Sequence, residues 1–261
     1  MNFINSKPAT DGMRISLNEI STRAPESFDK KETKELHKKI TDELEELQNL
    51  LYAEGKHSIL IILQGPDASG KDGAIRDVFS RMNPQGLFVK SFKVPTPEEA
   101  SHDFLWRVHK YAPPRRMIHI FNRSHYEDVL VTRVHKLCDD KTAKARMEAI
   151  NNFERLLHEH NGTHILKFYL HVSKEEQQER LRERMTNPAK MWKYNAKDFE
   201  EADRWDEYRR YYEECFKLCD YVPWHIVPSD QNWYKEYYIA NELCKLLKSL
   251  NMKYPSLEKA R

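Results

Sequence analysis

Apolar and polar positions along the chain form two recurring patterns, longer amphipathic stretches and short apolar runs. The first amphipathic stretch covers 30–55 and ends at Gly55, where a helix would stop. Its apolar residues recur at helical spacing, at Leu36, Ile40, Leu44, Leu47 and Leu51. The continuous apolar run SILIILQ (58–64) follows and is typical of a strand that is covered on both faces. The pattern therefore predicts a packing helix followed by a buried strand.

The alternation of the two patterns continues along the rest of the chain. Further strands are predicted at 87–94, 116–121, 164–172 and 224–229. Further helices are predicted at 73–82, 97–111, 126–134, 141–158, 174–185, 197–218 and 233–250. Because strands alternate with helices, we expect an α/β fold with a five-stranded parallel sheet covered on both faces. No linker or repeat divides the chain, so a single domain over 1–261 is predicted, with 1–25 as an irregular N-terminal arm.

One segment between two predicted helices differs from the rest. The sequence NPAKMWKYNAKD (187–198) is rich in lysine and aromatic residues, and Pro188 and Asn195 would break a helix. We interpret it as the tip of a helical hairpin that projects from the sheet. The region from about 174 to 215 is thus a candidate helical lid.

Composition narrows the class of protein. The chain is 39% hydrophobic and 32% charged, and its longest apolar run, ILIIL, is far too short to span a membrane. The start of the chain lacks a basic region followed by an apolar stretch, and the four cysteines are scattered, which disfavours a secretory signal, a disulfide or a zinc site. We therefore expect a cytoplasmic protein. The net charge is only +2, so a polyanion would have to be bound by local clusters, and neither a nucleic acid nor a membrane partner is expected.

The sequence GPDASGKDG, which follows the first predicted strand, has the spacing of a phosphate-binding loop. A strand, a G-x-x-x-x-G-K motif and a helix coincide here, which is the context in which this motif is informative. The glycines let backbone amides converge on an anion, the helix N-terminus adds partial positive charge, and Lys71 supplies a cation. The alternative is a glycine-rich turn of a parallel sheet. The candidate phosphate-binding residues are Gly65, Ala68, Ser69, Gly70, Lys71, Asp72 and Gly73.

Two carboxylates in this loop, Asp67 and Asp72, are unexpected beside a phosphate. An unpaired carboxylate ~4 Å from phosphate would cost several kcal/mol at an effective dielectric near ~20. Asp67 is therefore tolerable only if a cation bridges the two anions or Lys71 neutralises it. Asp72 replaces the Ser or Thr that commonly ligates Mg²⁺, so it either ligates a cation, directly or through water, or caps the helix.

The second polar cluster, IFNRSHYEDVLVTRV, begins with the third predicted strand. Its polar residues start where the strand ends, at the edge where parallel sheets gather ligands. Asn122 stands where many phosphate-loop enzymes have a metal-binding Asp, and Arg123 is placed to neutralise a transferred phosphate. Glu127 and Asp128 are either metal ligands or first-turn helix acids. Arg133 either extends the cationic surface or is solvated.

Several basic residues could bind an extended anion. In the lid, Arg180, Arg184, Lys190 and Lys193 either close over phosphates or belong to a salt-bridged surface helix. A basic track of Arg76, Arg81, Lys90 and Lys93 is the other candidate, although any one of these side chains could simply be solvated. His125 offers a nucleophile, but in-line transfer needs no covalent intermediate, so a hydrogen-bonding role is favoured.

Four motifs in order, GPDASGKDGAIRDVF, FKVPTPEE, FLWRVHKYAPPRRMIHIFNRSHYEDVLVTRV and NPAKMWKYNAKD, resemble those of the family-2 polyphosphate kinases. The resemblance runs from about Leu47 to Tyr238. These are P-loop enzymes that move phosphoryl groups between inorganic polyphosphate and nucleotides. The resemblance implies a three-layer α/β/α P-loop kinase fold with a helical lid, dependence on Mg²⁺ or Mn²⁺, and a homodimer or homotetramer.

Matched motif by motif, the resemblance assigns transfer roles to four residues. Asp67, Lys71, Arg123 and Arg180 correspond to residues that family members need for catalysis, although the register at Arg180 is less well defined. Many members have Asp-Arg-Ser where this chain has Asn122, Arg123 and Ser124, and the sequence NRSHYED resembles the subgroup that accepts both AMP and ADP. Since Asn is a poorer cation ligand than Asp, the metal would depend on other carboxylates. The candidates are Asp67, Asp72, Glu127 and Asp128.

The resulting hypothesis is metal-assisted in-line transfer of a phosphoryl group from inorganic polyphosphate to AMP or ADP, giving ADP or ATP, with the reverse reaction also open. The acceptors are adenine nucleotides, with guanine nucleotides left open. An ATP-dependent nucleoside monophosphate kinase is the alternative within the same class, because it shares the loop and a lid. A nucleotide-binding switch that transfers nothing is the alternative from another class.

Overall fold

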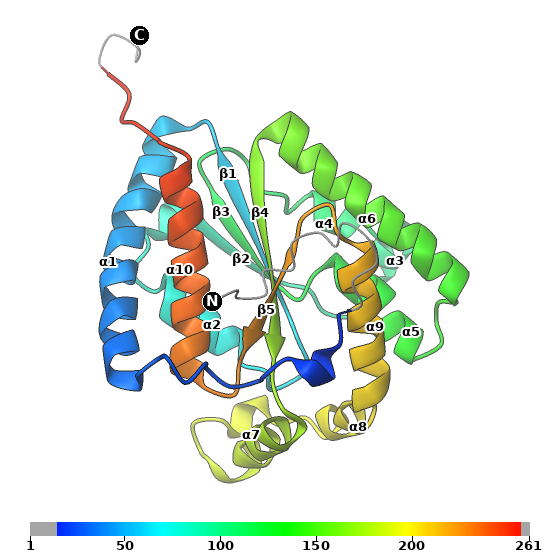
Figure 1. The fold of residues 1–261 in the computed structure, drawn as a ribbon. Coiled ribbons are helices and arrows are strands. Elements are labelled where there is room, and N and C mark those ends of the chain that lie inside the picture. Colours follow the sequence, from blue (N-terminus) through cyan, green and yellow to red (C-terminus); the bar gives the residue numbers. More distant parts are fainter. Residues whose placement is uncertain (1–14, 257–261) are drawn as a thin grey trace.

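Five strands form one parallel sheet in the order β2-β3-β1-β4-β5, as predicted for the fold class (Figure 1). The computed structural model describes residues 15–256. The strands are β1 (Ser58–Gln64), β2 (Leu87–Ser91), β3 (Ile118–Asn122), β4 (Thr163–His171) and β5 (Trp224–Pro228). The central strand β1 pairs Leu63 with Asn122 of β3, so the segments that follow both strands emerge side by side.

Burial on both faces of β1 explains its unbroken apolar sequence. Ile59 and Ile61 pack into the core on one face, and Leu60 and Ile62 pack into the core on the other. The first face is covered by α1 (Lys30–Glu54), α2 (Lys71–Phe79) and α10 (Asn232–Ser249). The second is covered mainly by α6 (Asp140–Asn161) and α9 (Trp205–Leu218). The sheet is thus the middle layer of three (Figure 1).

Shorter elements connect these layers. They are the helices α3 (Pro97–Ser101), α4 (Trp106–His109), α5 (Val131–Val134), α7 (Lys174–Thr186) and α8 (Lys197–Asp203), and the 3-10 helices η1 (Leu17–Glu19), η2 (Pro84–Gly86), η3 (His125–Val129) and η4 (Met191–Lys193). The helices α7 and α8 project beyond the sheet (Figure 1). This hairpin corresponds to much of the predicted lid, whereas α9 places Tyr212, Cys215 and Phe216 in the main core.

Three helices predicted as continuous are broken in the structure. The stretch 97–111 divides because the Asp103 carboxylate accepts from the amides of Leu105 and Trp106 and begins a new turn. The stretch 126–134 consists of η3 and α5, which meet at Leu130 with φ −111° and ψ −81°. The stretch 197–218 divides at Arg204. A helical period alone does not reveal such breaks, because the apolar spacing continues across them.

The predicted N-terminal arm is packed where the structure describes it. Residues 1–14 lie outside the described part, but Leu17 is 1% exposed within the core of the second face. Its amide donates to Glu213 of α9 at 2.8 Å, and the hydroxyl of Thr22 donates to Asp230 at 2.7 Å, just before α10. We call residues 15–28 the strap, because they cross the sheet from α9 to α10 (Figure 1).

The exclusions drawn from composition can be compared with the described residues. No helix within 15–256 has the length and apolar character needed to cross a bilayer. Cys138, Cys215, Cys219 and Cys244 are all free thiols in the structure.

Candidate active site

The predicted phosphate loop connects β1 to α2 at the carboxyl end of the sheet. Gly70 precedes α2 with φ 95°, and Ala68 has φ 61°, a left-handed conformation that is uncommon without glycine. The positive φ of Gly70 favours glycine at this position, and a Cβ atom there would also meet Nζ of Lys235 at 2.3 Å and displace it. The strained Ala68 is typical of a functional loop.

Every backbone carbonyl from Gly65 to Gly70 accepts a hydrogen bond from a side chain. Lys71 Nζ donates to Gly65 O and Pro66 O at 2.7 and 3.0 Å. Gln177 donates to Asp67 O at 3.0 Å, and Arg180 donates to Ala68 O and Ser69 O at 3.2 and 3.1 Å. Lys235 Nζ donates to Gly70 O at 3.2 Å. These side chains therefore fix the backbone of the loop in place.

Lys71 is 8% exposed and lies beneath the loop. Its pKa is lowered to about 8, mainly by burial and also by the neighbouring Arg123, while Asp67 and Glu127 oppose the shift. The ammonium group is therefore costly to hold without an anion. Phosphate binding would restore its usual pKa.

Arg123 lies between the loop and the second polar cluster. Its guanidinium forms an ion pair with Asp67, and its Nη1 lies 3.6 Å from Oε2 of Glu127. Burial opposes the charge, but Glu127 and Asp67 outweigh it and raise the pKa of Arg123. Arg123 also has a left-handed φ of 62°. The predicted proximity of Asp67, Lys71 and Arg123 is thus present in the structure, and the cations Lys71 and Arg123 offset the Asp67 carboxylate.

Asp72 contacts side chains from two other elements. Asn122, at the end of β3, donates to its Oδ1 at 2.8 Å, and Lys193 of the lid donates to Oδ2 at 2.7 Å. Burial raises the pKa of Asp72, but Lys193 and Asn122 outweigh that effect and lower it. Gly70, the residue before α2, makes no side-chain cap. The side chain of Asp72 makes its hydrogen bonds with Asn122 and Lys193. This carboxylate therefore joins the loop to the lid.

The carboxylates predicted to hold a metal do not form one cluster. Within residues 15–256, no three His, Cys, Asp or Glu side chains converge as a ready-made metal site. Asp67 and Glu127 do line the same cavity and share Arg123. Mg²⁺ usually keeps several waters and takes only one or two carboxylates plus substrate phosphates, so this pair fits such an ion.

Asp128 has different neighbours. Burial raises its pKa to about 6, and its nearest charges include Arg107 and Arg146. A carboxyl group with this pKa is a weaker candidate for a metal ligand at neutral pH than Asp67 or Glu127.

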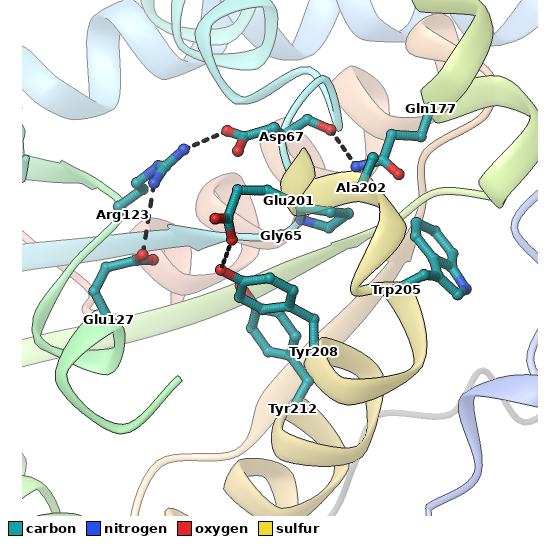
Figure 2. Close-up of a pocket in the computed structure, with 11 residues that line it drawn as sticks. Gly65, Asp67, Arg123, Glu127, Gln177, Glu201, Ala202, Trp205, Tyr208 and Tyr212 are labelled. Carbon is teal, nitrogen blue, oxygen red and sulfur yellow. Dashed lines mark hydrogen bonds and ion pairs between the residues drawn. The ribbon is translucent and has the colours of Figure 1, made fainter. Parts of the chain in front are cut away.

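A cavity of about 40 Å³ opens between the loop, Arg123 and the lid side of α9 (Figure 2). Its lining residues are Gly65, Pro66, Asp67, Arg123, Glu127, Gln177, Glu201, Ala202, Trp205, Tyr208 and Tyr212. Tyr208 donates to Glu201 at 2.5 Å across its wall. Sequence reasoning missed Glu201, Trp205 and Tyr208. These three residues recur at helical spacing, which could have indicated that they share one face of a helix. The same spacing is equally typical of a helix face that packs on the core.

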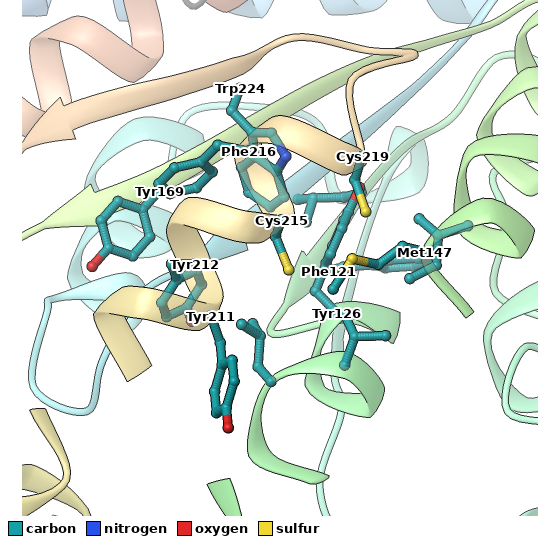
Figure 3. Packing of buried hydrophobic residues seen from close by; sticks show 14 of the residues in the cluster. Phe121, Tyr126, Met147, Tyr169, Tyr211, Tyr212, Cys215, Phe216, Cys219 and Trp224 are labelled. Carbon is teal, nitrogen blue, oxygen red and sulfur yellow. The ribbon is translucent and has the colours of Figure 1, made fainter. Parts of the chain in front are cut away.

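The floor of the site rests on a tightly packed core (Figure 3). Tyr212 reaches from the cavity into this aromatic cluster, 4.5 Å between ring centroids from Tyr169. Gln64 lies at the end of β1, and its side-chain amide is best oriented with the nitrogen toward Glu127. In that orientation the nitrogen donates to Glu127 Oε1 at 3.0 Å, and the oxygen accepts from Ser124 Oγ at 3.0 Å. The core thus fixes the segment that carries Arg123 and Glu127.

Below η3, a buried ion pair joins three elements. Lys167 of β4 and Glu154 of α6 are both fully buried, and Nζ lies 2.9 Å from Oε2. Tyr126 donates to Glu154 at 2.7 Å and accepts from Lys167 at 2.8 Å. His125 is also fully buried, 3.6 Å from Glu154, and burial lowers its pKa. His125 therefore faces the core, which agrees with a structural role.

Each basic residue predicted in the lid has an acidic partner. Arg180 pairs with Glu176 at 2.7 Å, and its other nitrogens donate to the loop carbonyls and to Ser229 O and Asp230 O. The remaining pairs are Arg184 with Asp198, Lys190 with Glu183 and Lys193 with Asp72. Arg180 thus lies at the root of the lid against the loop, and Lys193 is the lid cation that reaches the loop side chains.

The other predicted basic residues have contacts away from the loop. Arg76 pairs with its neighbour Asp77 on α2, and Arg81, which follows α2, pairs with Asp42 of α1. Lys90 lies over the ring of Tyr111 with 4.0 Å to the centroid, and Lys93 is exposed. The basic track stays a prediction.

Arg133 is 5% exposed. It pairs with Asp140 and Glu214 at 2.7 and 2.6 Å and lies 4.0 Å from the ring centroid of Tyr211. With its charge offset by two carboxylates, Arg133 has the contacts of a residue that joins helices.

Comparison with known proteins identifies the family. The family model described as polyphosphate kinase 2 (PPK2) matches residues 27–255. An AMP/ADP-polyphosphate phosphotransferase of Meiothermus ruber is 48% identical over 83% of this chain and 82% of its own length. An ADP-polyphosphate phosphotransferase of Rhodopseudomonas palustris is 40% identical over 96% of this chain and 92% of its own. The crystal structure of polyphosphate kinase 2 from Arthrobacter aurescens TC1 superposes with a TM-score of 0.90, at 39% identity, over 94% of this chain and 89% of that one. The chain belongs to the polyphosphate kinase 2 family.

Proposed function

We propose that this kinase transfers a phosphoryl group from inorganic polyphosphate to AMP and to ADP, giving ADP and ATP, and that the reverse transfer uses the same site. The names of its relatives support polyphosphate as donor and adenine nucleotides as acceptors. The observation that carries the proposal is Arg123, held between the loop carboxylate Asp67 and Glu127 beside Lys71. This places two cations and two carboxylates at the point where phosphates meet.

The residues of the chain supply positioning and charge. The loop amides and Lys71 hold one phosphate group, and Arg123 neutralises charge that develops on the transferred phosphoryl group. A nucleotide phosphate oxygen is already ionised near neutral pH, so the acceptor needs no strong general base. Only the acceptor phosphate group is assigned to the cavity beside Glu127 and Tyr208, because about 40 Å³ is too small for a whole nucleotide. Polyphosphate approaches from the lid and the basic track.

A divalent cation, Mg²⁺ or Mn²⁺, belongs to the proposal. Asp67 and Glu127 would hold it together with substrate phosphates, and when bound it supplies further positive charge against the phosphates. Asp72 is a further candidate through its position beside the loop. The dimer or tetramer implied by the family also stays a prediction.

The test supplies the purified protein with polyphosphate, Mg²⁺ and either AMP or ADP, and follows ADP and ATP by chromatography. We expect product from both acceptors without added ATP, and loss of turnover with excess EDTA that is restored by Mg²⁺. Product only when ATP is the donor would instead indicate a nucleoside monophosphate kinase. Nucleotide binding without any transfer would indicate a switch.

A further inference from the structure

Lys235 is buried at a position that is electrostatically unfavourable for a lysine. It is 1% exposed and lies in the first turn of α10, where the helix dipole opposes a cation. Its Nζ donates to Gly70 O at 3.2 Å and to Asn232 Oδ1 at 2.8 Å, both neutral oxygens. Its pKa is lowered to about 8, mainly by burial and also by Arg180 and Lys71. The fold therefore holds this charge at a cost.

The charges around Lys235 come from three elements. Arg180 of α7 and Lys71 of α2 add positive charge, and both donate to carbonyls of the same loop. Glu236 of α10 and Asp77 of α2 are the neighbouring acids; the pKa of Glu236 is raised to about 7 by its own burial, an effect that Lys235 opposes and Asp77 adds to. Lys235 and Arg180 thus donate to loop carbonyls from α10 and α7, and Lys71 donates to another loop carbonyl from the start of α2.

Packing alone does not account for Lys235. Gly70 O already accepts from the amide of Ala74 at 3.0 Å, so this carbonyl is satisfied without the lysine. A buried ammonium with neutral partners costs stability relative to an apolar side chain of similar size. Gly70 also leaves space for it, since a Cβ there would meet its Nζ at 2.3 Å. Such a group is expected to contribute when an anion binds.

We propose that Lys235 is a positioning residue for the phosphate loop, which holds the Gly70 peptide in place and adds positive charge behind the loop when phosphate binds. The inference rests on one part of the proposed function, namely that the loop binds phosphate. The amides at the start of α2 then remain directed at the anion, because the carbonyl on the other side is fixed. Lys235 acts from behind the loop, through Gly70.

The experiment compares Lys235→Met, which removes charge and donor, with Lys235→Gln, which keeps a neutral donor. Lys245→Met is the matched control, because Lys245 lies on the same helix with its side chain 64% exposed and pairs with Glu242. The probe is inorganic tripolyphosphate with Mg²⁺, measured by calorimetry at a temperature where circular dichroism shows each variant folded. Melting temperature without ligand is recorded for each variant.

We expect Lys235→Met to bind tripolyphosphate about tenfold or more weakly, with an unliganded melting temperature equal to or above that of the wild type. Its KM for polyphosphate should rise more than its kcat falls. Lys235→Gln should lie between it and the wild type, and Lys245→Met should match the wild type.

An affinity loss below about fivefold in folded Lys235→Met would overturn the inference, whatever its melting temperature. If Lys235→Met does not fold, the same threshold applies to Lys235→Gln. If the wild type binds tripolyphosphate but makes no ATP, the proposed function fails while the binding test of Lys235 still decides this inference.

Discussion

Arg123 explains at the level of single residues how a phosphate loop tolerates Asp67. The guanidinium pairs with Asp67 on one side and with Glu127 on the other, and Lys71 lies beneath. The charge argument made from sequence required a cation beside this acid, and the structure provides Arg123 and Lys71. The backbone strain at Arg123, φ 62°, is the local cost of that placement.

Substitution of the two loop residues should separate activity from folding. Lys71→Ala and Asp67→Asn should each lower kcat/KM by a factor of about 100 or more, because each removes charge that acts on the transferred phosphate. Circular dichroism and the melting temperature should stay close to wild type. The control is Lys56→Ala, whose side chain is 69% exposed. Normal turnover by either loop variant would refute its assigned role.

The lowered pKa of Lys71 predicts the pH dependence of activity. With a pKa of about 8 in the free enzyme, the lysine loses its charge above that pH, so kcat/KM should fall on the alkaline side of about 8. The contribution of Lys71 to the free energy of unfolding should rise with pH over the range in which kcat/KM falls. Between about 8 and the unfolded value of 10.5, the unfolded chain binds the extra proton, so unfolding free energy rises with pH.

A pH–rate profile and urea unfolding at pH 7 to 10 measure both effects. Lys71→Arg is the informative variant, because a guanidinium keeps its charge throughout this range. Whatever the absolute rate of this variant, its kcat/KM should not show the decrease above pH 8 that deprotonation of Lys71 causes in the wild type. An alkaline limb identical to that of the wild type would assign the fall to another group, of which Lys235 is the first candidate.

The sequence could predict the site residues that lie in motifs, but not residues elsewhere in the chain that contact the loop backbone. Asp67, Lys71 and Arg123 lie at motif positions next to strand ends, where topology alone brings them together. Lys235 carries no such signal, since a lysine in an amphipathic helix is ordinarily solvated. Arg133 is the opposite case: the sequence made it a candidate for the site, and the fold pairs it with Asp140 and Glu214.

At the level of elements, strands were predictable and helix continuity was not. Apolar runs located all five strands, although the edge strand β2 is partly exposed and is not covered on both faces. The breaks at Leu130 and Arg204 arise from backbone conformations that apolar spacing does not encode. The break at Leu130 matters for the site, because η3 carries Glu127 and turns it toward Arg123.

The buried pair of Lys167 and Glu154 should be essential for anchoring η3 between β4 and α6. Lys167→Met alone leaves the Glu154 carboxylate buried without its cation, so unfolding free energy should fall by about 3–5 kcal/mol. The double variant Lys167→Met with Glu154→Leu should recover much of that loss. Urea unfolding measures both.

The matched control for this prediction is an exposed ion pair. Lys248 and Glu43 have side chains 53% and 42% exposed, so Lys248→Met should change stability by less than about 1 kcal/mol. Equal losses for the two lysine variants would contradict the anchoring role of Lys167.

At the level of the whole molecule, the strand order places the loop after β1 beside the cluster after β3. The alternation of strands and helices predicted the parallel sheet but not this strand order. The packing of the strap was not predicted either, because its sequence is mostly polar; Leu17 is buried in the core, and Ile15 and Ile20 pack against the same cluster. That residues 1–261 form one domain stays a prediction, as does assembly into dimers or tetramers.

The strap should stabilise the whole fold, since it connects helices on opposite faces of the sheet. Leu17→Ala should lower the free energy of unfolding by about 2–5 kcal/mol, because it leaves a cavity at a fully buried position. Val94→Ala, at a residue that is 88% exposed, should change it by less than about 0.5 kcal/mol. Denaturant unfolding compares them, and a similar small effect of both would show that the strap is dispensable.

The six fixed carbonyls of the loop have a consequence for how the chain tolerates mutation. Backbone contacts do not depend on which side chain a loop residue carries, so positions such as Pro66 should accept more substitutions than a motif suggests. The constraint moves to the donors Gln177 and Lys235, which lie 110 and 165 positions along the chain from the residues they hold. In a saturation mutagenesis screen for activity, those two positions should rank with the loop glycines in intolerance, although no sequence motif includes them.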